Sequence, residues 1–393
     1  MRAVKAVQQH YTPGPEILQM LEQFRQMLND CVRIGLAENV TSLKSLSTKA
    51  YNQLATYDVM SYYKLCAISK ATGILKNYRK AKRQGMRVKE PYARQLQLTT
   101  CYGFKIKTIE KALSLPFKPK QPLSIPLNAH VLRVLSEPDI QIRSVTLTDQ
   151  RLSISYAKEV ELIQPHGLIA IDRNLDNLTV AASDGQMGRR NLAKATEVKA
   201  MYREIRSHMR RNDLRIRQRV TGKCGRKQRE KVKQILHHAS KQIVLDAKRR
   251  EFGIVMEKLT GIRKLYRKGN WQGRGYRGRM NAWSFTELQR QIEYKARWQG
   301  IPVIYVNPSG TSVKCSICGS RMKPEENRTL KCRSCGFTVD RDVNAARNIL
   351  ARGMRFAPVA SALEAMVQEP RTAGNPESRW KRVNMLKLHE PTS

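Results

Sequence analysis

The amino-acid sequence predicts a multidomain α/β protein with a four-cysteine metal-binding element near its C-terminal end. In the second half of the chain, continuous apolar runs that suit strands buried on both faces alternate with long helical patterns. Residues 96–160 instead show short alternating segments with prolines, which are typical of a β-rich module. Two CxxC pairs complete the pattern. A chain of 393 residues with 41% hydrophobic content is long enough for two or three domains with cores of their own.

The charge of the chain indicates a large polyanionic partner. Lysine and arginine number 73 against 32 aspartates and glutamates, which gives a formal net charge of +41. Solubility requires far less, so this charge favours nucleic acid as the partner, ahead of a membrane surface. A basic binding protein of the ribosomal type is the alternative. No apolar run approaches the roughly 20 residues of a membrane-spanning helix, and residues 1–10 lack the apolar segment of a signal peptide. We therefore expect a cytoplasmic, nucleoid-associated protein.

The first half of the chain predicts a small helical bundle beside the β-rich module. Residues 1–8 alternate as a short strand, which could pair with the later β-segments and make the bundle an insertion. A helix is expected from Pro15, because proline suits the first helical turn and apolar residues then recur at helical spacing over residues 17–36. Further helical stretches extend through residues 54–80. Two alternating segments within residues 142–156 predict a hairpin.

The end of the helical region is strongly basic and carries a tyrosine among its lysines and arginines. This composition suits the binding of phosphates and the stacking of a base. The candidate nucleic-acid-binding residues are Lys76, Tyr78, Arg79, Lys80, Lys82 and Arg83. For any single one of them, a solvated helix face is the alternative.

The second half of the chain predicts a sheet with helices between its strands. Strands are expected over residues 168–171, 178–182, 253–257 and 301–306. Residues 199–250 predict two antiparallel basic helices interrupted near residues 221–225, and residues 284–299 predict an amphipathic helix. The glycine- and arginine-rich residues 261–282 predict a mobile loop, and residues 357–393 a poorly ordered tail.

Carboxylates occur at positions where this sheet would place a ligand site. Asp172 directly follows one apolar run and Glu257 ends another, so the two would lie close together if their strands are neighbours. Asp340 and Asp342 precede a further helical segment. Three converging carboxylates bind Mg²⁺, and two such ions could activate a water and stabilise the leaving oxygen in phosphodiester cleavage. The alternatives are that Asp340 and Asp342 only cap a helix and that Glu257 only solvates a strand end.

The four paired cysteines predict a structural zinc site. They are Cys315, Cys318, Cys332 and Cys335, with thirteen residues between the two pairs. Each pair is followed by a glycine, Gly319 or Gly336, that eases the turn after its second cysteine. Four thiolates leave no open position on the ion, so this Zn²⁺ should not be catalytic. A pair of redox dithiols is the alternative. The other four cysteines are scattered, which argues against a disulfide framework.

From about Gly167 to Leu350, the sequence resembles the TnpB family, the transposon-encoded RNA-guided nucleases related to type V CRISPR effectors. The motifs that carry the resemblance are Ala170-Ile171-Asp172, Ile254-Val255-Met256-Glu257-Lys258-Leu259, Trp283-Ser284-Phe285, Thr311-Ser312-Val313-Lys314-Cys315 and Asp340-Arg341-Asp342-Val343-Asn344-Ala345-Ala346. The first half of the chain resembles the family more loosely, chiefly over residues 73–80. The chain departs from many relatives at Asn174, where they have glycine, and at Lys258, where they often have an acid.

The resemblance implies a split RuvC nuclease domain of RNase H-like fold, in which Asp172, Glu257 and Asp342 are the catalytic carboxylates that hold Mg²⁺. Asp342 is preferred to Asp340 because the third acid of the family immediately precedes the x-Asn-Ala-Ala segment. The expected domains in chain order are a wedge β-module (1–12 and 96–162) around a helical recognition lobe (13–95), the nuclease domain (163–310 and 337–356) around the zinc knuckle (311–336), and the tail (357–393).

The resemblance also implies an activity. The expected function is an RNA-guided, Mg²⁺-dependent DNA endonuclease that cleaves target DNA next to a short adjacent motif. Its partners would be a guide RNA derived from the transposon end and the target DNA, with one protein per RNA. Two alternatives stay open: a nuclease-inactive RNA-guided DNA-binding regulator, and a guide-free nuclease or resolvase of RNase H-like fold.

Overall fold

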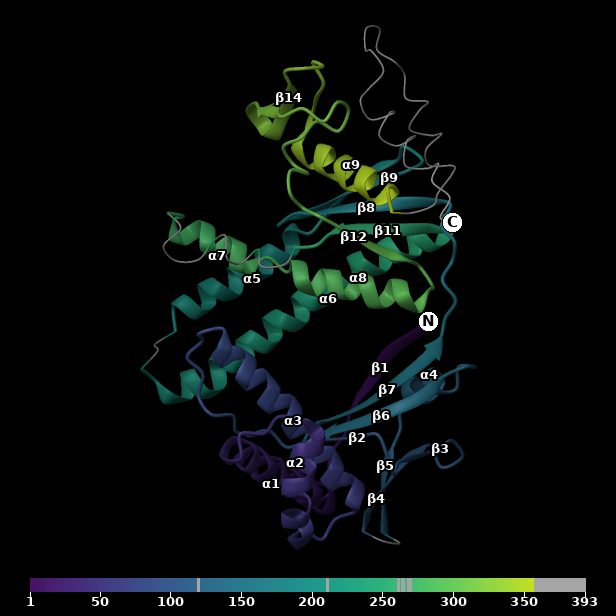
Figure 1. Cartoon of the computed structure of the whole chain (residues 1–393), viewed down its shortest axis with the longest axis vertical. Coiled ribbons are helices and arrows are strands. Elements are labelled where there is room, and N and C mark those ends of the chain that lie inside the picture. Colours follow the sequence, from purple (N-terminus) through teal and green to yellow (C-terminus); the bar gives the residue numbers. More distant parts are fainter. Residues whose placement is uncertain (119–120, 210–211, 260–261, 263–265, 267–270, 357–393) are drawn as a thin grey trace. The chain divides into compact units, whose positions relative to one another are not determined.

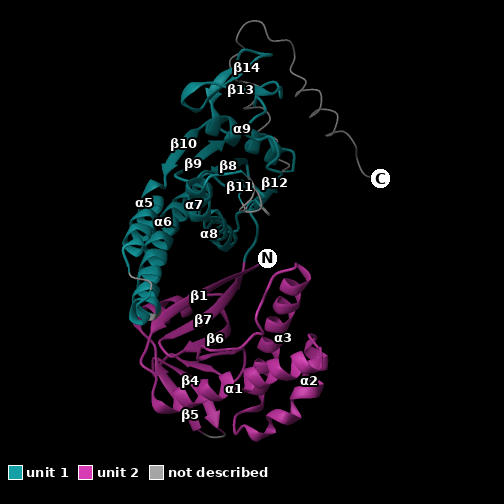
Figure 2. Ribbon diagram, turned by 90° about the vertical axis from the view of Figure 1, so that its left-hand side faces the viewer, with its two compact units in different colours: residues 1, 160–393 teal, residues 2–159 magenta. Residues whose placement is uncertain are grey.

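The computed structural model of the protein describes residues 1–118, 121–209, 212–259, 262, 266 and 271–356. The chain forms two compact units, one of residues 2–159 and the other of Met1 with the chain from Val160 onward (Figure 2). None of the described helices combines the length and hydrophobicity needed to cross a membrane. The tail predicted over residues 357–393 lies outside the described residues.

Two antiparallel sheets form the β-part of the unit of residues 2–159. Their strands are Arg2–His10 (β1), Gln97–Thr100 (β2), Lys105–Lys107 (β3), Ala112–Lys118 (β4), Gln121–Pro126 (β5), Gln141–Thr148 (β6) and Arg151–Glu159 (β7). One sheet has the order β1-β7-β6-β2 and the other β3-β4-β5. β1 pairs with β7 over its whole length, so the first strand joins the later β-segments as predicted. The predicted hairpin is the pair β6-β7.

Helices fill the interval between β1 and β2. They are Pro15–Ala37 (α1), Leu43–Ala50 (α2), the 3₁₀ helix Asn52–Thr56 (η1) and Ser61–Arg83 (α3), and Ala129–Leu135 (α4) follows β5. α1 begins at Pro15, as its sequence predicted. It packs against α3, and the buried side chains of the two helices include Phe24, Leu28 and Ile68. The bundle is therefore an insertion into the first sheet.

The second unit is built on a five-stranded mixed sheet. Its strands are Gly167–Arg173 (β8), Asn177–Ala182 (β9), Met187–Asn191 (β10), Phe252–Glu257 (β11) and Val303–Val306 (β12). They lie in the order β10-β9-β8-β11-β12, with β11 parallel to both β8 and β12. β10 was not predicted, because it is almost entirely exposed and polar and has no apolar alternation. The parallel pairing of β8 with β11 brings their carboxyl ends side by side.

Helices cover both faces of this sheet (Figure 1). Ala193–Ser207 (α5), Thr221–Arg249 (α6) and Phe285–Trp298 (α8) lie on one face, and Arg341–Met354 (α9) lies on the other. In β8, Ile169 and Ile171 pack among the side chains of α6 and α8, whereas Leu168 and Ala170 pack against α9. Because successive side chains of a strand point to opposite faces, a strand covered on both sides must be apolar throughout.

Two predictions about the helices of this unit were wrong in part. The break between the basic helices lies between α5 and a π-helical turn, Ile216–Val220 (η2), whereas residues 221–225 belong to α6. A single glycine such as Gly222 costs a helix only about 1 kcal/mol, so it need not end one. Asp213 starts the second helical segment by accepting a hydrogen bond from the backbone N–H of Ile216 at 3.1 Å. The segment predicted as a mobile loop contains the helix Arg274–Ala282 (α7). Most of residues 260–270 lie outside the described residues.

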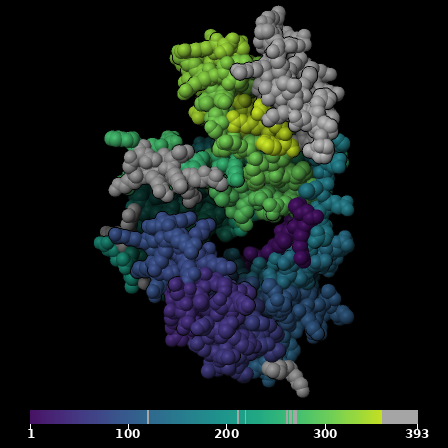
Figure 3. Space-filling model, in the orientation of Figure 1, coloured from purple at the N-terminus to yellow at the C-terminus, as the bar shows by residue number. Residues whose placement is uncertain are grey.

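The four paired cysteines lie in and around a small three-stranded antiparallel sheet. Its strands are Met322–Pro324 (β13), Thr329–Cys332 (β14) and Thr338–Asp340 (β15), with the short helix Glu326–Arg328 (η4) between the first two. Met322 and Leu330 pack against the cysteines and form a separate small core. The structure extends the predicted zinc knuckle (311–336) through β15, and from here on we call residues 311–340 the knuckle. It projects from its unit as the yellow-green region at the top of Figure 3. α9 begins directly after β15, the last strand of the knuckle.

Candidate active site and four-cysteine cluster

Three carboxylates meet on the face of the sheet that α9 covers, two from the central strands and one from α9 itself. Asp172 lies two positions after Ala170, and Glu257 lies two positions after Val255, and both of these apolar residues face α9. Asp342 lies in the first turn of α9. All three line one cavity of about 340 Å³. The other side chains that line it include Asn174, Asp176, Tyr276, Trp283, Thr311, Ser312 and Arg328.

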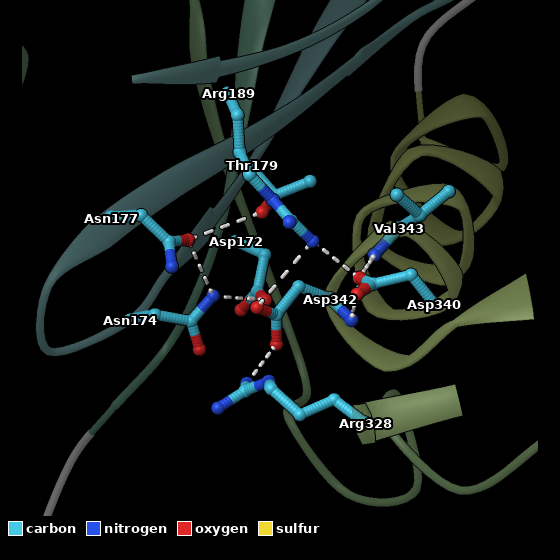
Figure 4. A network of polar contacts seen from close by, with 9 residues as sticks. All are labelled: Asp172, Asn174, Asn177, Thr179, Arg189, Arg328, Asp340, Asp342 and Val343. Carbon is cyan, nitrogen blue, oxygen red and sulfur yellow. Dashed lines mark hydrogen bonds and ion pairs between the residues drawn. The ribbon is translucent and has the colours of Figure 1, made fainter. Parts of the chain in front are cut away.

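Asp172 is buried, with 7% of its surface exposed. The side-chain amide of Asn174 donates a hydrogen bond to Asp172 Oδ2 at 2.9 Å, and Asn177 and Thr179 extend this network along β9 (Figure 4). Burial, and then the charges of Glu257 and Asp342, raise the pKa of Asp172 from 3.8 to about 7, although the bond from Asn174 acts in the opposite direction. A buried carboxylate of this kind favours a nearby positive charge.

Glu257 is 8% exposed and is held by two neighbours. Thr311 Oγ1 lies 2.6 Å from Glu257 Oε1, and the guanidinium of buried Arg173 donates to the backbone oxygen of Glu257 at 2.5 Å. Burial raises the pKa of Glu257, while the hydrogen bond from Thr311 and the charge of Arg173 oppose that effect. Arg173 also bonds Gln289 of α8 at 2.8 Å, so it ties the ends of β8 and β11 to that helix.

Asp340 and Asp342 have different environments. Asp340 is the N-cap of α9: its Oδ1 accepts hydrogen bonds from the backbone of Asp342 at 2.9 Å and of Val343 at 3.1 Å, and it pairs with Arg189 at 2.5 Å. Although burial raises the pKa of Asp340, these bonds together lower it. The predicted alternative, a helix cap, therefore describes Asp340. Asp342 is 3% exposed and lines the cavity instead.

Two arginines reach Asp342 from different elements (Figure 4). Arg328 of the knuckle pairs with Asp342 Oδ1 at 2.5 Å, and Arg189 of β10 lies 3.8 Å from Oδ2. Arg328 has a positive φ of 64°, which is uncommon for a residue with a side chain and carries a modest conformational cost. Its contact with Asp342 shows that the knuckle contributes a side chain to the acid site.

The donor set of the cavity fits a hard divalent cation. Three buried carboxylates converge there, and burial raises the pKa values of Asp172 and Glu257 although hydrogen bonds and the charge of Arg173 act in the opposite direction. Mg²⁺ is bound in proteins through a few carboxylate oxygens and retains waters for a substrate phosphate. Asp172, Glu257 and Asp342 are the residues that would hold it.

The four cysteines of the knuckle converge as their spacing predicted. Their Sγ atoms all lie within 4.8 Å of one another, with 3.7 Å between Cys315 and Cys335 and 3.4 Å between Cys318 and Cys332. Gly319 and Gly336 have φ values of 78° and 73°, the left-handed conformation that glycine adopts without strain. This donor set fits a tetrahedral Zn²⁺ with no open coordination position.

Comparison with known proteins decides the family. The family model for the Cas12f1-like TNB domain matches residues 285–349, which include α8, β12, the knuckle and most of α9. A TnpB-like protein of Methanocaldococcus jannaschii is 31% identical over 223 residues, an alignment that covers 54% of this chain and 79% of that protein. The chain belongs to the TnpB family.

A curated Cas12f1 relative and a solved Cas12f1 structure also match this TnpB-family chain. The CRISPR-associated endodeoxyribonuclease Cas12f1 of Sulfoacidibacillus thermotolerans is 39% identical over 116 residues, which cover 29% of this chain but 25% of that protein. Among solved structures, the Cas12f1 chain of a complex with sgRNA and target DNA superposes with a TM-score of 0.58. It shares 16% identity and covers 85% of this chain and 81% of its own, so it shows a common mixed α/β fold.

The predicted nucleic-acid-binding residues all lie on α3, in the unit of residues 2–159. Lys76, Lys80, Lys82 and Arg83 are exposed. Lys82 Nζ lies 5.1 Å from the centre of the Tyr78 ring. Arg79 is half-buried and bonds the side chain of Thr41 at 3.2 Å and the backbone and side chain of Asn39. Arg79 therefore has hydrogen-bond partners within its own unit and does not lie on a fully solvated helix face.

Several residues of the TnpB site were not predicted. Asn174 had been noted only as a departure from the family, although it bonds Asp172. Thr311 lies four positions before Cys315, in a motif quoted only for its resemblance. Arg189 and Arg328 come from an unpredicted strand and from the knuckle, 153 and 14 positions before Asp342. No spacing rule connects these arginines with the acid, so only the folded structure could find them.

Proposed function

We propose that this TnpB-family protein is a transposon-encoded, RNA-guided and Mg²⁺-dependent DNA endonuclease. The observation that carries the proposal is the convergence of Asp172, Glu257 and Asp342, which come from three separate segments of the chain, on one cavity. In this interpretation the five-stranded sheet with its helices is a RuvC-like nuclease domain of RNase H-like fold. The relationship to an endodeoxyribonuclease, 39% identical over 116 residues, supports DNA as the substrate.

The three carboxylates would hold the catalytic cations, and their neighbours would fix them in place. Mg²⁺ ions bound there, two in this proposal, would activate a water and stabilise the leaving oxygen of the phosphodiester. The amide of Asn174 orients Asp172 through its hydrogen bond to Oδ2. Arg328 carries a positive charge at the rim of the cavity, where it is suited to a backbone phosphate of the substrate.

The zinc of the knuckle would have a structural role. Four cysteine thiolates would bind it and hold the knuckle that carries Arg328 and leads into the first turn of α9. Zinc would thereby support Asp342 without contacting the substrate.

The partners follow from the charge and from the relatives. A guide RNA derived from the transposon end, bound as one RNA per protein, would supply the sequence specificity, and the protein would read a short motif in the target DNA next to the paired region. One neighbour of known structure is a Cas12f1 complex with sgRNA and target DNA, which supports these two partners. We propose that the unit of residues 2–159 contains the wedge and recognition parts and that the exposed cations of α3 contact nucleic acid.

The test is cleavage by the full chain purified with its RNA. We expect Mg²⁺-dependent cutting of a duplex that matches the guide, little cutting of a mismatched duplex, and loss of activity in the Glu257→Gln variant. Glu293→Gln, on the surface of α8 and paired there with Arg297, is the matched control and should retain activity. Binding without cutting by the wild type would make the protein a regulator, and cutting that needs no RNA would make it a guide-free nuclease. Either result would contradict the proposal.

A further inference from the structure

Thr311 occupies a buried position between the strand β12 and the first cysteine of the knuckle. It is 2% exposed, and its hydroxyl oxygen lies 2.6 Å from Glu257 Oε1. Among the described residues, this is the one hydrogen bond to a carboxylate oxygen of Glu257. A carboxylate that accepts one short bond of this kind loses most of its freedom to rotate.

The hydroxyl of Thr311 has one proton and two acceptors within reach. The second acceptor is the backbone oxygen of Pro308 at 2.9 Å. That oxygen also accepts the backbone N–H of Thr311 at 3.4 Å, so it does not depend on the hydroxyl. An ionised carboxylate is the stronger acceptor, and the distance to it is shorter. In the ionised state of Glu257, the hydroxyl proton therefore goes to the carboxylate.

The backbone of Thr311 is fixed by the same helix that carries Asp342. On α9, Asn344, Asn348 and Arg352 recur every four positions and so share one face. The side-chain amide of Asn348 donates to the backbone oxygens of Thr311 at 2.8 Å and Lys314 at 2.7 Å. Asn344 hydrogen-bonds to residues that follow Thr311, and Arg352 to residues that precede it.

These outer bonds complete a ladder between α9 and the start of the knuckle. Asn344 donates to the backbone oxygen of Lys314 at 2.8 Å and accepts from the backbone of Ser316 at 3.0 Å. Arg352 donates to the backbone oxygen of Ser309 at 2.8 Å. The ladder sets the position of the Thr311 hydroxyl relative to the helix on which Asp342 lies.

We infer that Thr311 is a positioning residue that orients the Glu257 carboxylate for binding of a divalent cation. The inference rests on the proposed function, since it assumes that Glu257 and Asp342 hold the same cation or pair of cations. It adds to that function a structural link between Glu257 and Asp342. The hydroxyl of Thr311 bonds Glu257, and the backbone of Thr311 is held by α9, the helix that carries Asp342. Partners that orient metal-binding carboxylates change metal affinity by roughly 10–100-fold when they are removed.

Two substitutions separate the hydroxyl from the shape of the side chain. Thr311→Val keeps the size and branching of threonine but cannot donate a hydrogen bond, whereas Thr311→Ser keeps the donor. The probe is Mn²⁺ alone, titrated calorimetrically into the full chain freed of nucleic acid, with the Asp342→Asn protein as background. Zinc content and melting temperature report folding. The concentration of Mg²⁺ that gives half-maximal cleavage is then measured with the RNA-bound protein.

The expected result is a roughly 10–100-fold weaker affinity for Mn²⁺ in Thr311→Val and near wild-type affinity in Thr311→Ser. The half-maximal Mg²⁺ concentration should rise in the valine variant while the cleavage rate at saturating Mg²⁺ largely recovers. Equal affinity in the wild type and Thr311→Val would overturn the inference and leave the proposed function intact. If the wild type itself bound no more Mn²⁺ than the Asp342→Asn background, the proposed metal site would fail, and this inference with it.

If Thr311→Val loses its zinc or unfolds, Asn348→Ser gives a second test. It removes the amide that holds the backbone of Thr311 but leaves both the hydroxyl and the carboxylate in place. Weaker affinity for Mn²⁺ is expected again, together with unchanged zinc content. Full affinity in this variant would show that α9 does not set the position of Thr311.

Discussion

Replacing Asp172 by asparagine is expected to stabilise the metal-free protein at pH 8. Asp172 is buried beside Glu257 and Asp342, and its pKa is raised from 3.8 to about 7. A shift of this size corresponds to roughly 4 kcal/mol of unfavourable free energy for the ionised folded state. Relaxation of the site and entry of water reduce it, so roughly 2 kcal/mol is a reasonable figure, or about 4–8 °C in Tm for a unit of this size.

The sign follows from the protons bound in each state. The unfolded chain releases the proton of Asp172 near pH 4, whereas the folded protein retains it up to about pH 7. The folded state therefore binds more protons in this window, and the contribution of Asp172 to stability falls as the pH rises from about 4 to about 7. Asparagine does not titrate. The gain in Tm of Asp172→Asn over the wild type should be roughly a third of its full size at pH 5 and reach that size above pH 7.

Thermal unfolding between pH 5 and pH 8 in EDTA measures this effect. Saturating Mg²⁺ should reverse the order at pH 8, because the cation stabilises the wild type and has a weaker site in the variant. The matched control is Asp340→Asn. Asparagine can still cap α9, but it loses the ion pair with Arg189 that helps to lower the pKa of Asp340, so the substitution should reduce the Tm at neutral pH. A Tm of Asp172→Asn at or below that of the wild type at pH 8 would refute the account of the buried charges.

Three further predictions concern the knuckle and the basic helix. Cys332→Ser should lower zinc content, Tm and cleavage together, and full activity without zinc would contradict a structural role for the ion. Arg328→Gln should lower the Tm of the metal-free protein by about 2–4 °C, because it leaves Asp342 without its nearest cationic side chain. Saturating Mg²⁺ should restore most of this loss, and an unchanged Tm in the metal-free protein would refute the pairing. Lys80→Gln should weaken binding of RNA and reduce the slope of log affinity against log salt by up to about one, whereas an unaltered slope would remove Lys80 from the interface.

The central strands and the cysteines could be predicted because each has a strong local pattern. Residues 168–171 of β8 are all apolar, since α6 and α8 pack on the odd residues and α9 on the even ones, and such a run is visible in the sequence. Asp172 and Glu257 directly follow or end these runs. The spacing of the cysteine pairs specifies the turn geometry that a single ion requires. These features predicted four of the five strands of the sheet, the carboxylates Asp172 and Glu257, and the cysteine cluster.

The remaining features depend on contacts between distant segments. β10 is polar because its side chains are mostly exposed, so it carries no periodic signal, yet it supplies Arg189. Five of the nine residues of α7 are glycine or arginine, so the segment was predicted to be a loop, although Tyr276 and Met280 contribute to the cavity wall. Asp340 and Asp342 are equivalent in sequence as helix-capping acids. The family resemblance favoured Asp342 as the third carboxylate, and the structure shows that Asp340 caps α9 while Asp342 lines the cavity with the other carboxylates.

The assignment of the third carboxylate gives the most direct test of the proposed nuclease site. Single-turnover cleavage of a guide-matched duplex should be compared for Asp342→Asn and Asp340→Asn, each bound to its RNA and measured well below its own Tm. The site described here predicts a loss of at least about 1000-fold in Asp342→Asn, which removes a ligand of the catalytic cation, and a loss within about 10-fold in Asp340→Asn. Comparable losses in the two variants, or the larger loss in Asp340→Asn, would contradict it.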